Sequence, residues 1–146
     1  MCLSILVLLS SCSSPWVNEA KENGDIITVH EQNLILHISK PEGQNYTIYK
    51  KIEDIETVNT IMNVLQYVSW ENAKVSMSRQ PDYKINTINT DPTVSFKPVT
   101  YSVWLSPKKD ILEVIIEGQS KYGKLTKKDS TMLLRFLKLP NMGVLN

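Results

Sequence analysis

The sequence predicts an α+β domain: an antiparallel β-sheet with two helices packed on one face. Several short segments alternate apolar and polar residues, which is typical of half-buried strands. In two other segments the apolar residues recur every three or four positions, which is typical of amphipathic helices. The resulting order is strands, helix, strands, helix, and a sheet covered by helices on one face accounts for it best.

The first strands are expected from Asp25 onward. Residues 26–29 and 34–38 are β-rich runs on either side of a polar turn, so they predict a hairpin. Proline and glycine in the segment 40–43 then predict a loop. A further strand is expected over residues 46–52.

The first helix is expected where the apolar spacing changes, between Ile52 and Val68. Polar residues occupy its opposite face. Asp54 is the expected N-cap, because a carboxylate can accept hydrogen bonds from the free N–H groups of the first turn. It also complements the positive end of the helix dipole.

The middle of the chain predicts less regular structure. Residues 70–79 are expected to form a connection, with a short strand at 75–78. Another strand is expected over residues 83–88. The segment 89–98 is polar and contains two prolines, so it predicts a loop.

The last third predicts a hairpin followed by a helix. Residues 99–105 alternate, a turn with Pro107 follows, and residues 111–117 return. A short strand is expected at 122–125. Thr126 has the spacing of an N-terminal capping pair with Asp129, and the helix should then run to Lys138.

Size and charge restrict the class of protein. A chain of 146 residues has the length of a single domain. Its net charge of +1 gives no electrostatic reason to expect nucleic acid as a partner. One local excess of basic residues is interpreted as a solvated face, with contact to phosphate or anionic lipid as the alternative. This basic cluster contains Lys121, Lys124, Lys127, Lys128, Arg135 and Lys138.

The two cysteines, Cys2 and Cys12, both lie in the first dozen residues. From residue 13 to residue 146 the chain therefore has no cysteine. A disulfide, a thiolate nucleophile and a cysteine-ligated zinc ion are all excluded from that part.

The N-terminus predicts export and lipid anchoring. The apolar run from Leu3 to Leu9 is too short to span a bilayer but suits an export signal. Leu9-Ser10-Ser11-Cys12 resembles the lipobox of bacterial lipoproteins. That resemblance implies removal of the signal peptide 1–11 and lipidation of Cys12. The polar segment 12–24 would be a tether and residues 25–146 the domain. The alternative is that the run forms an apolar strand or helix.

Candidate chemical groups are few. His30, Glu31 and His37 could hold a metal, although their spacing matches no zinc motif and ordinary strand histidines are the favoured interpretation. Glu113 and Glu117 lie along one side of a predicted strand, where a solvated role is favoured over acid–base catalysis. The sequence predicts no catalytic residue and no cofactor.

Four aromatic residues are the best candidates for a binding surface: Trp70, Tyr83, Tyr101 and Trp104. In the predicted hairpin, Trp104 falls on the polar side of its strand, and an exposed indole is often a contact residue. The alternative is that a helix covers it. The loop 89–98 would complete this surface.

A family resemblance follows from several of these segments together. They are residues 55–61, 70–75, 81–85, 101–105, and Tyr122 with Leu125. Together they resemble the YhfM-like domain of small lipoproteins from Bacillus and relatives, over roughly residues 46–139. The resemblance implies a lipid-anchored envelope protein and brings no activity or catalytic residue with it.

The sequence thus favours a monomeric, non-enzymatic binding or accessory module on the outer face of a Gram-positive cell membrane. Its partners would be the membrane, through the lipid on Cys12, and an unknown protein or small molecule. The alternative is a metal-dependent enzyme or metal-binding module that uses His30, Glu31 and His37.

Overall fold

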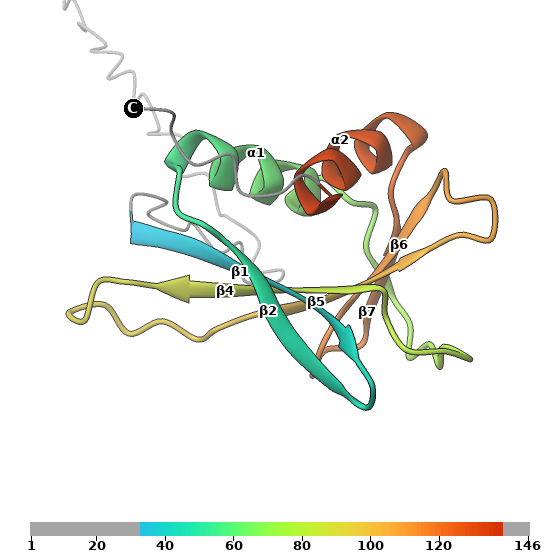
Figure 1. Ribbon diagram of the computed structural model, residues 1–146, viewed down its shortest axis with the longest axis horizontal. Coiled ribbons are helices and arrows are strands. Elements are labelled where there is room, and N and C mark those ends of the chain that lie inside the picture. The colour runs from blue at the N-terminus through green and yellow to red at the C-terminus, as the bar shows by residue number, and fades with distance from the viewer. Residues whose placement is uncertain (1–32, 139–146) are drawn as a thin grey trace, which may run out of the picture.

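A computed structural model describes residues 33–138 of the chain. These residues form an antiparallel sheet of seven strands in the order β2-β1-β4-β5-β6-β7-β3. Figure 1 shows both helices on the same face of this sheet. The predicted fold class is therefore confirmed. The elements are β1 Leu34–Glu42, β2 Asn45–Ile52, α1 Ile55–Gln66, β3 Glu71–Asn72, β4 Tyr83–Asn89, β5 Thr100–Leu105, β6 Leu112–Ile116, β7 Lys121–Lys124 and α2 Lys127–Lys138.

The core lies between the sheet and the two helices. From α1 it receives Val58, Ile61 and Leu65, and from α2 it receives Leu133 and Leu137, all of them fully or almost fully buried. Burying one such side chain stabilises a fold by about 1.5–3 kcal/mol. The sheet contributes Leu36 and Ile38 of β1, Ile85 of β4, Val103 of β5, and Leu112 and Val114 of β6.

Both helices begin at the predicted capping groups. The Asp54 carboxylate accepts hydrogen bonds from the backbone N–H and hydroxyl of Thr57, at 2.9 and 2.7 Å. These bonds hold the pKa of Asp54 below its usual value. At α2, the Thr126 hydroxyl accepts from the Asp129 N–H at 3.1 Å and donates to the Asp129 carboxylate at 2.7 Å. Both N-terminal predictions are confirmed.

The first hairpin of the described region differs from the prediction. β1 does not stop before Pro41 but continues to Glu42, and the turn follows at Gly43, which has a φ of 64°. Proline is tolerated here because the pairing of β1 with β4 has already ended at Ser39 and Lys84. The strand predicted at 26–29 lies outside the described residues.

The strand predicted at 75–78 is wrong. The chain instead pairs earlier, as β3, where Glu71 and Asn72 lie opposite Tyr122 and Lys121 of β7. The Ala73 N–H then donates to the Glu71 carbonyl at 3.0 Å, so the chain turns out of the sheet. Val75, with no strand to pair with, is 37% exposed.

Candidate functional site

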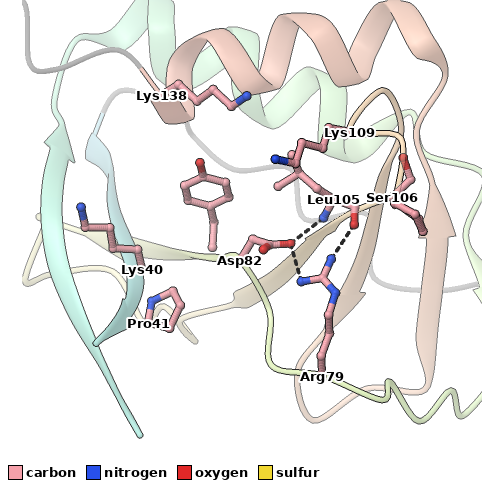
Figure 2. Close-up of a pocket in the computed structure, with 10 residues that line it drawn as sticks. Lys40, Pro41, Arg79, Asp82, Leu105, Ser106, Lys109 and Lys138 are labelled. Atoms are coloured by element: carbon pink, nitrogen blue, oxygen red, sulfur yellow. Dashed lines mark hydrogen bonds and ion pairs between the residues drawn. The ribbon is translucent and has the colours of Figure 1, made fainter. Parts of the chain in front are cut away.

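One hollow in the described residues gathers positively charged side chains, and we call it the lysine hollow. It has a volume of about 670 Å³. It opens where the end of β1, the start of β4, the β5–β6 turn and the C-terminus of α2 meet (Figure 2). Its polar lining is Lys40, Arg79, Asp82, Tyr83, Lys109 and Lys138, with Ser106 beside the apolar Pro41, Leu105 and Pro107.

The lining of the lysine hollow contains four cations and a single carboxylate. That carboxylate, Asp82, accepts from the Arg79 guanidinium at 2.8 Å and from the Leu105 backbone N–H at 2.7 Å. Figure 2 shows these bonds on one side of the hollow. Because Arg79 and Asp82 compensate each other, the positive charge that remains is that of Lys40, Lys109 and Lys138.

These three lysines are exposed and come from β1, the β5–β6 turn and α2. The Lys40 ammonium lies 5.1 Å from the centre of the Tyr49 ring, a cation–π contact. No ion pair of Lys109 or Lys138 is found within residues 33–138. The ammonium groups of Lys109 and Lys138 can therefore interact with solvent or with a bound anion.

The end of α2 is already satisfied without Lys138. The last carbonyls of a helix need outside donors. Here the Lys50 ammonium donates to the Phe136 carbonyl at 2.6 Å, and the Tyr49 hydroxyl donates to the Leu137 carbonyl. Lys138 is therefore not required as a hydrogen-bond donor to these two carbonyls, although its charge favours the helix dipole.

Lys109 has an unusual backbone. Among the described residues other than glycine, it alone has a positive φ, of 58°. It closes the β5–β6 turn, where its N–H donates to the Ser106 carbonyl at 2.8 Å. Glycine or asparagine is the usual residue in this left-handed conformation, because a Cβ atom is crowded there. Backbone geometry does not explain why a lysine occupies this position.

Tyr83 supplies an aromatic wall to the lysine hollow and is the one residue of the predicted aromatic surface that lies there. Its ring is tilted against that of Tyr49, with the centroids 6.4 Å apart. Burial, and to a lesser degree the charge of Asp82, raise the pKa of the Tyr83 hydroxyl. The hydroxyl therefore stays protonated and can donate a hydrogen bond at neutral pH.

Trp104 lies on the predicted face of β5 but is not open to solvent. Its side chain is 6% exposed, and its indole N–H donates to the Arg79 carbonyl at 2.9 Å. The chain around Arg79, rather than a helix, provides this contact. The indole thus holds the backbone at Arg79, a residue that lines the lysine hollow.

The remaining two aromatic candidates belong to the helix side of the sheet. Tyr101 is 7% exposed, and its ring lies 6.4 Å from that of Trp70. The Trp70 indole donates to the Leu65 carbonyl at the end of α1, at 3.1 Å. The four predicted aromatic residues are therefore not brought together on one exposed surface.

The predicted carboxylates form ion pairs on the face of the sheet that carries no helix. Glu117 accepts from the Ser102 hydroxyl at 2.6 Å and pairs with Lys84 at 2.7 Å. Burial opposes the charge of Glu117, but these two partners outweigh it and hold its pKa below the usual value. Glu113 accepts from the Tyr122 hydroxyl at 2.7 Å. These contacts are structural.

The metal alternative falls mostly outside the described region, since His30 and Glu31 precede residue 33. His37 lies in β1 opposite Asn86 of β4. Within residues 33–138, no three His, Cys, Asp or Glu side chains come close enough to hold a metal ion. Cys12 also lies outside the described residues.

Most of the basic cluster predicted from the sequence does not line the lysine hollow. Lys121 donates to the Asn72 side chain at 2.6 Å, and Lys124 lies 3.3 Å from Glu113. From this cluster, Lys138 alone lines the lysine hollow. Lys40 and Lys109 join it from distant parts of the sequence. The signal that could have singled out Lys109 is its place in a tight turn where glycine or asparagine is common.

The family is decided by a match over most of the chain: residues 20–140 fit the model of the YhfM protein family. The chain belongs to the YhfM family. The predicted resemblance is thus confirmed over a longer stretch, and every residue that lines the lysine hollow lies within the YhfM match. No curated protein and no solved structure matches the chain. Neither YhfM helix in the described part is long and apolar enough to cross a membrane.

Proposed function

We propose that this YhfM protein is a lipid-anchored binding module on the outer face of the cell membrane, and that the lysine hollow is its ligand site. The proposal of lipid anchoring rests on the Leu9-Ser10-Ser11-Cys12 sequence, which follows an apolar run. A diacyl lipid on Cys12 would hold the protein at the membrane through two chains, enough for stable attachment.

The excess of positive charge in the hollow is the observation that supports ligand binding there. Lys40, Lys109 and Lys138 approach one space from β1, the β5–β6 turn and α2. Within residues 33–138 the lining has no second carboxylate to offset their mutual repulsion, since Asp82 is paired with Arg79. Like charges placed together disfavour the folded state unless an anion or solvent screens them. A ligand of opposite charge gives this arrangement a purpose.

Binding is a better interpretation of these groups than catalysis. Acid–base catalysis needs a base positioned beside the proton that it takes, and the lining of the hollow offers few acceptors. Among the described residues, Asp82 is the one carboxylate of the lining, and its Oδ2 atom accepts from both the Arg79 guanidinium and the Leu105 N–H, so Arg79 compensates its charge. The Ser106 hydroxyl donates to Asp110 at 2.9 Å. The lining is dominated by hydrogen-bond donors, the ammonium groups of Lys40, Lys109 and Lys138, which suit recognition of an anion.

Membrane fractionation of the Cys12→Ser variant tests the anchoring. The serine hydroxyl cannot form the thioether to the diacylglyceryl group, so the variant should keep its leader or leave the membrane fraction. Mass spectrometry of the mature wild-type N-terminus should find diacyl-modified Cys12. Cys2→Ser is the matched control, since Cys2 lies in the part that is removed, and it should be processed normally. Normal processing and full membrane retention of Cys12→Ser would rule out the lipobox.

A further inference from the structure

We infer that the lysine hollow binds the phosphate group of a phosphate ester, an assignment that deepens the proposed function and rests on it. The hollow offers three ammonium groups, and a protonated tyrosine hydroxyl stands at its wall. The hollow has a volume of about 670 Å³ and is open to solvent, so a phosphate group can reach its lining.

The arrangement of donors matches a phosphate because its oxygens accept from several directions at once. Figure 2 shows Lys40, Lys109 and Lys138 on different sides of the hollow. Each lysine is a compact point charge with three rotatable N–H donors, so it can follow the oxygens of a tetrahedral group. A planar carboxylate is matched better by the fork of an arginine, but Arg79 is already bound to Asp82 and to the Leu105 carbonyl.

The amount of charge also favours phosphate. Three ammonium groups without an ion pair inside the described range 33–138 line the hollow, whereas a carboxylate ligand carries one negative charge. A phosphate monoester carries about −1.5 to −2 at neutral pH and offers three strong acceptor oxygens. A phosphodiester headgroup carries one negative charge, but an anionic membrane presents many such headgroups on one surface. The chain as a whole has a net charge of only +1, which disfavours a long polyanion such as nucleic acid.

Two sources share this chemistry: a soluble phosphate ester and the headgroup of an anionic phospholipid. The first arm of the test titrates the purified full chain, in detergent, with glycerol 3-phosphate, and follows backbone amide resonances by NMR. The second arm measures sedimentation with vesicles of phosphatidylglycerol and phosphatidylcholine against vesicles of phosphatidylcholine alone. This arm uses the Cys12→Ser chain, so that the lipid anchor does not carry the protein to every vesicle.

Matched variants make the test specific to the hollow. Lys109→Gln and Lys138→Gln remove one charge each from the lining, and each should weaken binding about five- to tenfold. Lys108→Gln removes the neighbouring charge of the same turn, which is exposed and does not line the hollow. It should weaken binding less than twofold. Far-UV circular dichroism and thermal melts verify that every variant is folded.

In the soluble arm, glycerol 3-phosphate should shift the amide resonances of Tyr83, Ser106 and Lys109, and glycerol should not. In the vesicle arm, preference for phosphatidylglycerol that depends on Lys109 and Lys138 identifies a headgroup as the source. Equal losses for Lys108→Gln and Lys109→Gln, or no saturable binding in either arm, would overturn the phosphate assignment.

One more NMR titration distinguishes two outcomes: that the hollow does not bind phosphate, and that it is not a ligand site at all. A soluble extract of the cell envelope is treated with phosphatase, dialysed to remove the inorganic phosphate that is released, and added to the full chain. If this extract shifts the resonances of the hollow while glycerol 3-phosphate and the anionic vesicles do not bind, the hollow is a binding site for another anion and the phosphate assignment is wrong.

Discussion

At the scale of single residues, Lys109 is the position where a functional and a structural explanation of the hollow can best be told apart. Its positive φ of 58° places a Cβ atom in a conformation that costs roughly 1–2 kcal/mol in L-residues. Strained backbone of this kind concentrates at functional sites. Lys108 is also a lysine of this turn, but its φ is not positive. The strain therefore lies at Lys109, whose side chain lines the hollow.

Replacing Lys109 by glycine should therefore stabilise the protein while impairing its site. Glycine adopts this φ freely, and after its larger loss of chain entropy we expect a gain of about 0.5–1 kcal/mol in the free energy of unfolding. Urea unfolding followed by tryptophan fluorescence measures the change. Lys108→Gly is the control and should destabilise slightly, since it loosens the unfolded chain without relieving strain. A loss of stability in Lys109→Gly would mean that the lysine side chain itself holds the turn.

At the scale of elements, the sequence predicted those structures whose causes are local. The periodicity of α1 and the capping groups Asp54 and Thr126 act within a few residues, and both helices follow them. β3 was missed because its two residues depend on the free edge of β7, far along the chain. The lysine hollow depends on the strand order that places β1 beside β4 and β4 beside β5, which no local pattern reveals.

The packing of β7 against the end of α1 leads to a prediction at Gly123. A Cβ atom built there would lie 2.3 Å from a Val68 methyl and 3.4 Å from the Ser69 carbonyl oxygen. Val68 is 9% exposed and branched at Cβ, so it has little room to rotate away. Gly123→Ala should cost about 1–3 kcal/mol in the free energy of unfolding.

A second substitution checks this cause. Val68→Ala removes the obstructing methyl groups, so the double variant should recover part of the stability lost in Gly123→Ala. The measurement is a double-mutant cycle by urea unfolding, in which neighbouring residues show coupling of about 0.5–3 kcal/mol. Additive effects of the two substitutions would contradict the steric explanation.

At the scale of the whole molecule, the contact between β2 and α2 joins an early and a late part of the described sequence. β2 lies at one edge of the sheet and α2 is the last described element. Tyr49 and Lys50 of β2 donate to the carbonyls of Leu137 and Phe136. This contact also fixes the C-terminus of α2, and hence Lys138, above the hollow that Lys40 enters from β1 (Figure 2).

The same contact predicts a loss of stability at alkaline pH. Burial first, and then the neighbouring Tyr83, raise the pKa of the Tyr49 hydroxyl above its ordinary value of 10.0. The folded state therefore keeps this proton more firmly than the unfolded state. By linkage, the contribution of Tyr49 to stability is fully present below pH 10 and is lost as the pH rises beyond it.

Tyr49→Phe tests this prediction, because it removes the hydroxyl but keeps the ring beside Tyr83 and Lys40. At pH 7 the variant should lose about 1 kcal/mol of unfolding free energy, since the Leu137 carbonyl no longer receives its hydrogen bond. Between pH 10 and pH 11.5 the difference from wild type should shrink, because the Tyr49 hydroxyl ionises in the unfolded wild-type chain while the folded state keeps its proton, and the variant has no hydroxyl to ionise. Urea unfolding at each pH measures it, and Tyr67→Phe, which changes an exposed ring, is the control. A difference that stays constant from pH 7 to pH 11.5 would show that the Tyr49 proton does not join β2 to α2.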